Sequence, residues 1–248
     1  MAFIPFELRV FPLLGYYIIL SVFGLIITIK IFFNYRKKKH PAALYLTLSF
    51  AVLTLAIVVL AIGLAEAAIT GYYKEIYRFS LPFAYSMVIL ADIFLFKFTN
   101  QLTKKGKKAF IPLLLIGVVL IIVLFLPFNY WGMPQEEIGQ PYIRMYSTMG
   151  VVLFSYVIYI SIIVLCRITK KYSDSKIKKV RLSLLSYSMF SLILFFLMNI
   201  GDTILIVFYD HPGYSIFIYI AWIFALVFLI LSYFSLFMPK RLLERLEK

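Results

Sequence analysis

The stretch KKGKKAFIPLLLIGVVLIIVLFLPF, residues 104–128, decides the fold class. From Ala109 to Phe128 it contains no charged residue. A run of this length matches the roughly 20 residues that a helix needs to cross a bilayer. Lysines stand directly before it, as is typical of the cytoplasmic end of a transmembrane helix. The segment is therefore predicted to be a membrane-spanning helix.

The rest of the chain has the same character. Of its 248 residues, 63% are apolar and 15% are charged, and the mean hydropathy is +0.97. An ordinary globular domain is about half apolar and a quarter charged. We predict an all-α, polytopic membrane protein, a seven-transmembrane helix bundle that forms a single domain over residues 1–248 in the cell membrane. Pro82, Pro112 and Pro127 fall at predicted span ends. The predicted spans are residues 11–33, 42–71, 79–98, 109–128, 145–166, 182–209 and 214–238.

The basic residues predict the orientation, because positively charged loops are retained in the cytoplasm. Twenty of the 25 lie on one side of the predicted spans, so we expect the N-terminus outside and residues 239–248 to be a short basic cytoplasmic tail. This bias accounts for the formal charge of +14, so we expect anionic lipid headgroups and no nucleic acid as partners. The twenty basic residues on the predicted cytoplasmic side are Arg36, Lys37, Lys38, Lys39, Lys97, Lys104, Lys105, Lys107, Lys108, Arg167, Lys170, Lys171, Lys176, Lys178, Lys179, Arg181, Lys240, Arg241, Arg245 and Lys248.

The sequence offers little for catalysis. His40 and His211 fall on opposite predicted faces, and Cys166 is the only cysteine, so neither a histidine metal site nor a thiol motif is expected. No hydrolase, metalloprotease or phosphate-loop motif occurs. Microbial rhodopsins hold retinal on a lysine of the seventh helix, and residues 214–238 contain no lysine. We therefore expect no catalytic activity, no metal and no cofactor.

Three carboxylates stand inside predicted spans: Glu66, Asp92 and Asp202. An ionisable side chain in hydrocarbon costs several kcal/mol on insertion scales and normally faces the bundle interior with a partner or a function. Asn199, three residues before Asp202, falls on the same helix face. We predict that these four residues line a ligand-binding pocket, with Glu66 and Asp202 near the outer side. Two other interpretations remain open, structural cross-links between helices and a pathway for ions or protons.

The connection between the fifth and sixth predicted spans is the most basic. Its charges indicate that both helices extend past their apolar runs into the cytoplasm, where a signalling partner binds; a solvated loop that touches lipid is the alternative. The residues predicted to bind the partner are Lys170, Lys171, Lys176, Lys178, Lys179 and Arg181.

Two segments resemble the seven-transmembrane sensor module at the N-terminus of many prokaryotic histidine kinases. One is the basic approach to the sixth span, Lys176-Ile177-Lys178-Lys179-Val180-Arg181; the other is the exit SYFSLF followed by MPKRLL, residues 232–243. In that family the exit carries a soluble signalling domain. Because this chain stops at Lys248, the resemblance implies a receptor-like sensor whose output passes to a separate partner. A transporter or ion pathway and a structural subunit of a membrane complex are the alternatives.

Overall fold

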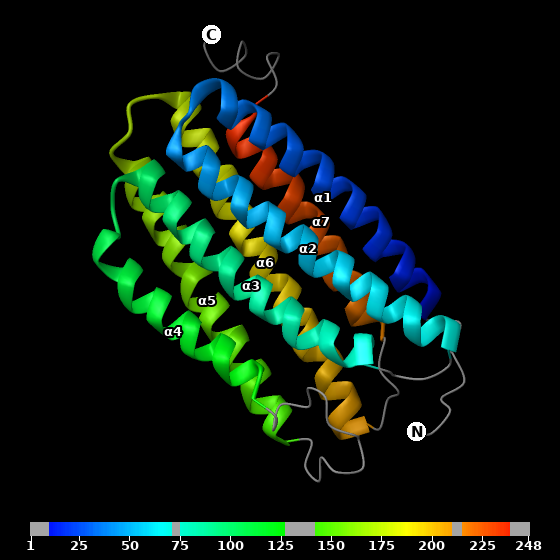
Figure 1. The fold of residues 1–248 in the computed structure, drawn as a ribbon. Coiled ribbons are helices and arrows are strands. Elements are labelled where there is room, and N and C mark those ends of the chain that lie inside the picture. Colours follow the sequence, from blue (N-terminus) through cyan, green and yellow to red (C-terminus); the bar gives the residue numbers. More distant parts are fainter. Residues whose placement is uncertain (1–9, 71–74, 127–141, 210–214, 239–248) are drawn as a thin grey trace. The chain divides into compact units, whose positions relative to one another are not determined.

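The structure, a computed structural model, describes residues 10–70, 75–126, 142–209 and 215–238. These residues form seven α-helices, one short 3-10 helix and no strand, which confirms the predicted all-α class (Figure 1). All seven helices are long and apolar enough to cross a membrane, the fourth together with the 3-10 turn before it. The elements are α1 (Val10–Lys38), α2 (Pro41–Thr70), α3 (Glu75–Thr103), η1 (Lys107–Ala109), α4 (Phe110–Leu124), α5 (Tyr142–Lys171), α6 (Lys176–Tyr209) and α7 (Ile216–Leu236).

The helices expose apolar side chains that a water-soluble protein would bury. On α4, Ile111 and Leu115 are 64% and 61% exposed. On α1, Ile19 is 63% exposed and Val22 is 54% exposed. Acyl chains would cover such surfaces at no cost, whereas contiguous apolar surface of this kind is rare on soluble monomers. The exposed surface and the helix lengths together identify a multi-pass membrane protein.

The chain divides into two compact units. The first, unit 1, comprises residues Met1–Phe98 and Lys107–Ser155. In it α1 and α2 form an antiparallel pair, dark and light blue in Figure 1. A Cβ atom on Gly24 would stand 2.6 Å from Oγ1 of Thr54, so glycine allows this close approach. The Ser49 hydroxyl of α2 donates a hydrogen bond to the Ala91 carbonyl of α3 at 3.1 Å.

The second, unit 2, comprises Thr99–Gly106 and Tyr156–Lys248, with the later part of α5 and helices α6 and α7. The Ser191 hydroxyl of α6 donates a hydrogen bond to the Phe224 carbonyl of α7 at 2.7 Å. Rings fill the space beside it: Phe195 meets Trp222 edge-on with centroids 5.3 Å apart. Because Trp222 is only 8% exposed, it packs α7 against α6, and this aromatic contact joins the helices at mid-span.

Helices α5 and α6 continue past their apolar runs, as predicted. α5 ends at Lys171 and α6 begins at Lys176. Lysine and arginine are good helix formers, so the backbone stays helical until Ser173-Asp174-Ser175, a sequence of turn-forming residues. The predicted cytoplasmic tail, residues 239–248, lies outside the described residues.

The expectation that Pro82 marks a span end is wrong. α3 begins seven residues earlier, at Glu75, and contains Pro82 within the helix. Proline is tolerated inside membrane helices where neighbouring groups satisfy the freed backbone atoms. The polar residues before Pro82 are helical because Glu66 of α2 supplies a hydrogen-bond acceptor for a backbone N–H in the first turn of α3.

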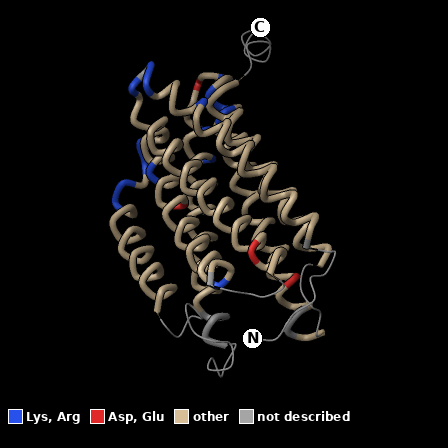
Figure 2. Tube along the Cα trace, turned by 45° about the vertical axis from the view of Figure 1, so that its right-hand side comes forward, with Lys and Arg blue, Asp and Glu red and all other residues tan. Residues whose placement is uncertain are grey.

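Basic residues gather at one end of each unit, taken by itself (Figure 2). In unit 1, the α1–α2 turn and η1 lie at the same end, because α1, α2, α3 and α4 alternate in direction. In unit 2, the Nζ atom of Lys105 lies 5.3 Å from the centre of the Tyr172 ring, which brings the turn after α3 beside the turn after α5.

This clustering predicts the result of cysteine labelling. We expect Lys37→Cys, Lys105→Cys and Lys176→Cys, each in a Cys166→Ser background, to resist a membrane-impermeant maleimide in intact cells and to react after permeabilisation. The Cys166→Ser chain, which has no cysteine, is the blank. Labelling of the Lys105→Cys variant from outside would contradict the predicted orientation.

Candidate functional site

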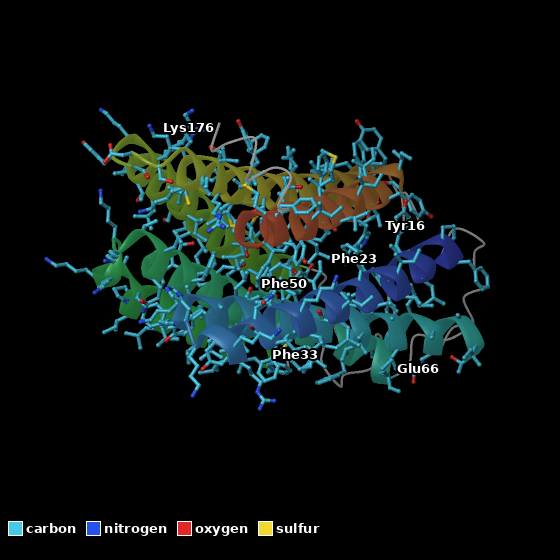
Figure 3. The ribbon with its side chains drawn as sticks, turned by 90° about the horizontal axis from the view of Figure 1, so that it is seen from above. Tyr16, Phe23, Phe33, Phe50, Glu66 and Lys176 are labelled. Atoms are coloured by element: carbon cyan, nitrogen blue, oxygen red, sulfur yellow. The ribbon has the colours of Figure 1, made fainter. Side chains whose placement is uncertain are left out.

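Glu66 lies near the end of α2 and holds the beginning of α3. Its Oε2 atom accepts a hydrogen bond from the backbone N–H of Tyr77 at 2.9 Å. Tyr77 is in the first turn of α3, where N–H groups have no partner within the helix. A carboxylate there also faces the positive end of the helix dipole. The half-buried Glu66 side chain therefore caps α3. Glu66 lies at the same end of unit 1 as Tyr16, and Phe33 lies toward the other end (Figure 3).

Asp202 of α6 caps the beginning of α7 in the same way. Its Oδ1 atom accepts a hydrogen bond from the backbone N–H of Ser215 at 2.8 Å. Ser215 is the N-cap residue of α7, and its own hydroxyl accepts from the N–H of Phe217 at 3.3 Å. Asp202 is 6% exposed, so this carboxylate is buried at the point where α7 begins. The start of α7 is thus held both by its own cap and by a side chain of α6.

Glu66 and Asp202 share one arrangement. Each lies near the end of one helix and accepts a backbone N–H at the beginning of the next, 11 and 13 residues along the chain. Glu66 belongs to unit 1 and Asp202 to unit 2. In both, the carboxylate supplies an acceptor for a backbone N–H that has no partner within its own helix.

Asp92, which lies within α3, is 1% exposed and is the most buried carboxylate among the residues that the structure describes. Its Oδ2 atom accepts a hydrogen bond of 2.6 Å from the Ser155 hydroxyl of α5. The adjacent residue, Ala91, is the one whose carbonyl accepts from Ser49 of α2. Two neighbouring positions of α3 therefore connect it to both α2 and α5, which makes this part of α3 the polar centre of unit 1.

Asn199 uses its side-chain amide within its own helix. Its Nδ2 atom donates to the Phe195 carbonyl at 2.8 Å, and the Asn199 carbonyl accepts from the Thr203 hydroxyl at 3.0 Å. Of the four predicted pocket residues, Glu66 and Asp92 lie in unit 1, and Asn199 and Asp202 lie in unit 2. Their grouping into one ligand pocket stays a prediction.

Sequence reasoning missed the partners of the carboxylates. Ser155 stands in an apolar run, where a serine usually bonds to its own helix, so nothing marked it as the partner of Asp92. Ser215 offered a signal, because a serine directly before an apolar run is a typical N-cap. The amide of Tyr77 offered none, since a backbone group carries no mark in the sequence.

The described residues contain no group of three or more histidine, cysteine, aspartate or glutamate side chains that could hold a metal ion. Cys166 is a buried free thiol. The described helix α7, which contains no lysine, offers no Schiff-base position.

The residues predicted to bind a partner surround the turn between α5 and α6. Lys170, Lys171, Lys176 and Lys178 are exposed, whereas Lys179 and Arg181 are half-buried. The Nζ atoms of Lys105 and Lys171 lie 5.3 and 5.9 Å from the centre of the Tyr172 ring. Tyr172 is 73% exposed, so two cations approach one aromatic ring on an accessible surface.

Comparison of the whole chain with protein-family models, with curated proteins and with solved structures gives no significant match in any of the three.

Proposed function

We propose that the protein is a membrane sensor in which an outer-side stimulus acts on buried carboxylates and changes the cytoplasmic end of α6. The observation that carries this proposal is the hydrogen bond from Ser215 N–H to Asp202. A cation, an amine or a proton that takes up the Asp202 oxygens would compete with that N–H. The start of α7 would then lose one of its two caps.

Helix α6 supports a direct route from this carboxylate to the basic turn. It is continuous from Lys176 to Tyr209. Asp202 and Lys176 are therefore about 40 Å apart along one helix axis, at 1.5 Å per residue. A packed helix moves as a body, so a change at one end reaches the other. The contacts of Ser191 and Phe195 with α7 make the pair α6–α7 the element that would shift.

The output would pass to a cytoplasmic partner at the basic turn. Lys170, Lys176 and Lys178 are exposed there. The resemblance to histidine-kinase sensor modules supports this direction of signalling, because in that family the same end of the membrane region leads to the signalling domain. An acidic surface on the partner fits the charge of the turn.

The proposal is tested with a fluorophore at the basic turn. The Lys178→Cys variant in a Cys166→Ser background is labelled with an environment-sensitive dye and reconstituted into vesicles with the N-terminus outward. We expect the emission to change when the outer solution is acidified or receives calcium or an alkylammonium ion. Asp202→Asn should abolish the change, because the amide keeps the hydrogen-bond acceptor but carries no charge for the stimulus to neutralise.

Asp174→Asn is the matched control, because it removes a carboxylate that is exposed in the α5–α6 turn. It should leave the response intact. A response of the Asp202→Asn variant equal to that of the parent would contradict the proposal. Ion or proton flux through the same vesicles, lost in Asp92→Asn, would instead favour the ion pathway, for which the fully buried Asp92 is the best candidate. A protein with neither response nor flux would be a structural subunit.

A further inference from the structure

Buried polar atoms without partners gather at the basic end of unit 2. Among the described residues, five buried side-chain atoms have no hydrogen-bond partner in the structure, and four of them belong to unit 2. Those four are Oδ1 of Asn100, Oγ1 of Thr169, Nε of Arg181 and Oγ of Ser232. Asn100, Thr169 and Ser232 are 2%, 9% and 0% exposed, so bulk water does not replace the missing bonds.

The four atoms lie at similar depth. Asn100 lies three residues before the end of α3, and Thr169 lies two residues before the end of α5. Ser232 lies four residues before the end of α7, and Arg181 lies five residues after the start of α6. At 1.5 Å per residue, all four are within about 8 Å of the same end of unit 2. Leaving a buried donor or acceptor unsatisfied costs about 1–3 kcal/mol. Four such costs at one level indicate a site that a polar ligand completes.

The chemistry of these atoms favours an anion. Arg181 Nε carries a hydrogen and only donates, and the hydroxyls of Thr169 and Ser232 can donate as well. The Asn100 Nδ2 atom donates to the Gly106 carbonyl at 3.5 Å. Its Oδ1 atom only accepts, so it would bind a hydrogen-bond donor of the ligand, such as a headgroup hydroxyl. A group rich in acceptor oxygens would satisfy the other three atoms, those of Arg181, Thr169 and Ser232.

Two exposed cations lie at the same end of unit 2 as these atoms. Lys105 and Lys171 meet at the Tyr172 ring, the first from the turn after α3 and the second from the end of α5. The turn that carries Lys105 has two residues in the left-handed region, Lys104 with φ 58° and Gly106 with φ 80°. This end of unit 2 therefore combines buried hydrogen-bond donors with exposed ammonium groups.

The site lies at the end of apolar helices, which is the level of lipid headgroups. We propose that it binds the phosphate of an anionic phospholipid headgroup, with Arg181 and Thr169 donating to the phosphate oxygens and Lys105 and Lys171 neutralising its charge. A lipid headgroup fits better than a soluble phosphate, because the acyl chains of the lipid would pack against the apolar surface of the surrounding helices. This inference stands independently of the proposed sensor role.

Native mass spectrometry of the full chain, titrated with phosphatidic acid in detergent, tests the inference. We expect one lipid to bind more tightly than the rest, and phosphatidylcholine to show no such step. Lys105→Gln/Lys171→Gln should weaken this step by about tenfold or more, because each basic group contributes appreciably to anionic-lipid affinity. Arg181→Met should weaken it at least as much. The double variant changes exposed side chains only, so it remains informative if the Arg181→Met protein fails to fold.

The matched control is Lys176→Gln/Lys178→Gln, which removes the same charge from exposed positions of the neighbouring turn. It should weaken the step by less than about threefold, because these lysines act only through diffuse attraction. Equal losses in both double variants would overturn the site in favour of diffuse electrostatics. Displacement of the lipid by inorganic phosphate or inositol hexakisphosphate would identify a soluble phosphate ligand and overturn the lipid source. If all variants bound the lipid as the parent does but lost a protein that co-purifies with the parent, the proposal would be overturned and the surface would be a binding site for that protein.

Discussion

Gly63→Ala is expected to destabilise unit 1 by about 1–3 kcal/mol, the usual cost of an added group in a full core. A Cβ atom at Gly63 would stand 2.7 Å from Oγ of Ser80 and 3.1 Å from Cα of Tyr77. The second contact is with backbone, so α3 itself has to move away from α2. Because Glu66 is less than one turn further along α2, the same displacement should lengthen its bond to the Tyr77 N–H. The free energy of unfolding in detergent, measured by titration with SDS, gives the size of the effect.

Gly15→Ala is the matched control for this change. Gly15 also lies within a helix, α1, but a Cβ atom there would have nothing within 4 Å. Alanine is favoured over glycine in helices by about 1 kcal/mol, so this variant should be neutral or slightly more stable. A Gly63→Ala protein as stable as the Gly15→Ala protein would show that α2 and α3 do not pack this closely.

Asp202→Ala is expected to have the second large effect. It leaves the N–H of Ser215 without its carboxylate acceptor in a buried position, which costs about 1–3 kcal/mol. Hydrogen exchange should locate the loss, with faster exchange at the start of α7 and unchanged exchange at mid-span. Asp202→Asn keeps a carbonyl oxygen at the same place and should cost less than half as much. Equal losses from the two substitutions would show that charge, and not the acceptor, stabilises this helix start.

The spans could be predicted from the sequence because a helix that crosses hydrocarbon needs apolar side chains along its whole length. The apolar residues 109–128 and the lysines before them sufficed for α4 without any tertiary information. The ends of the helices were harder, because they depend on what meets them. The start of α3 at Glu75 follows from an acceptor on α2, and no property of the residues around Pro82 reveals it.

The candidate site was predictable in its residues but not in its contacts. Asp92 stands out in the sequence because a carboxylate among apolar residues is costly. Its partner, Ser155, is 63 residues away and resembles any other serine in an apolar run. The atoms around Arg181 were hidden for a similar reason. The sequence shows that this residue is basic, and only the packed helices show that its Nε atom is buried without a partner.

The separation of each carboxylate from its partner sets an order for assembly. Glu66 and Asp202 find their N–H groups at the start of the very next helix, 11 and 13 residues later, so each hydrogen bond can form as soon as that helix begins. Asp92 must wait for Ser155, which follows 63 residues later, after another whole helix. During that interval the Asp92 carboxylate is in the nascent chain without this hydroxyl. The hydrogen bond that joins α3 to α5 can therefore form only after α4 and part of α5 have been added to the chain, which makes it a late contact of unit 1.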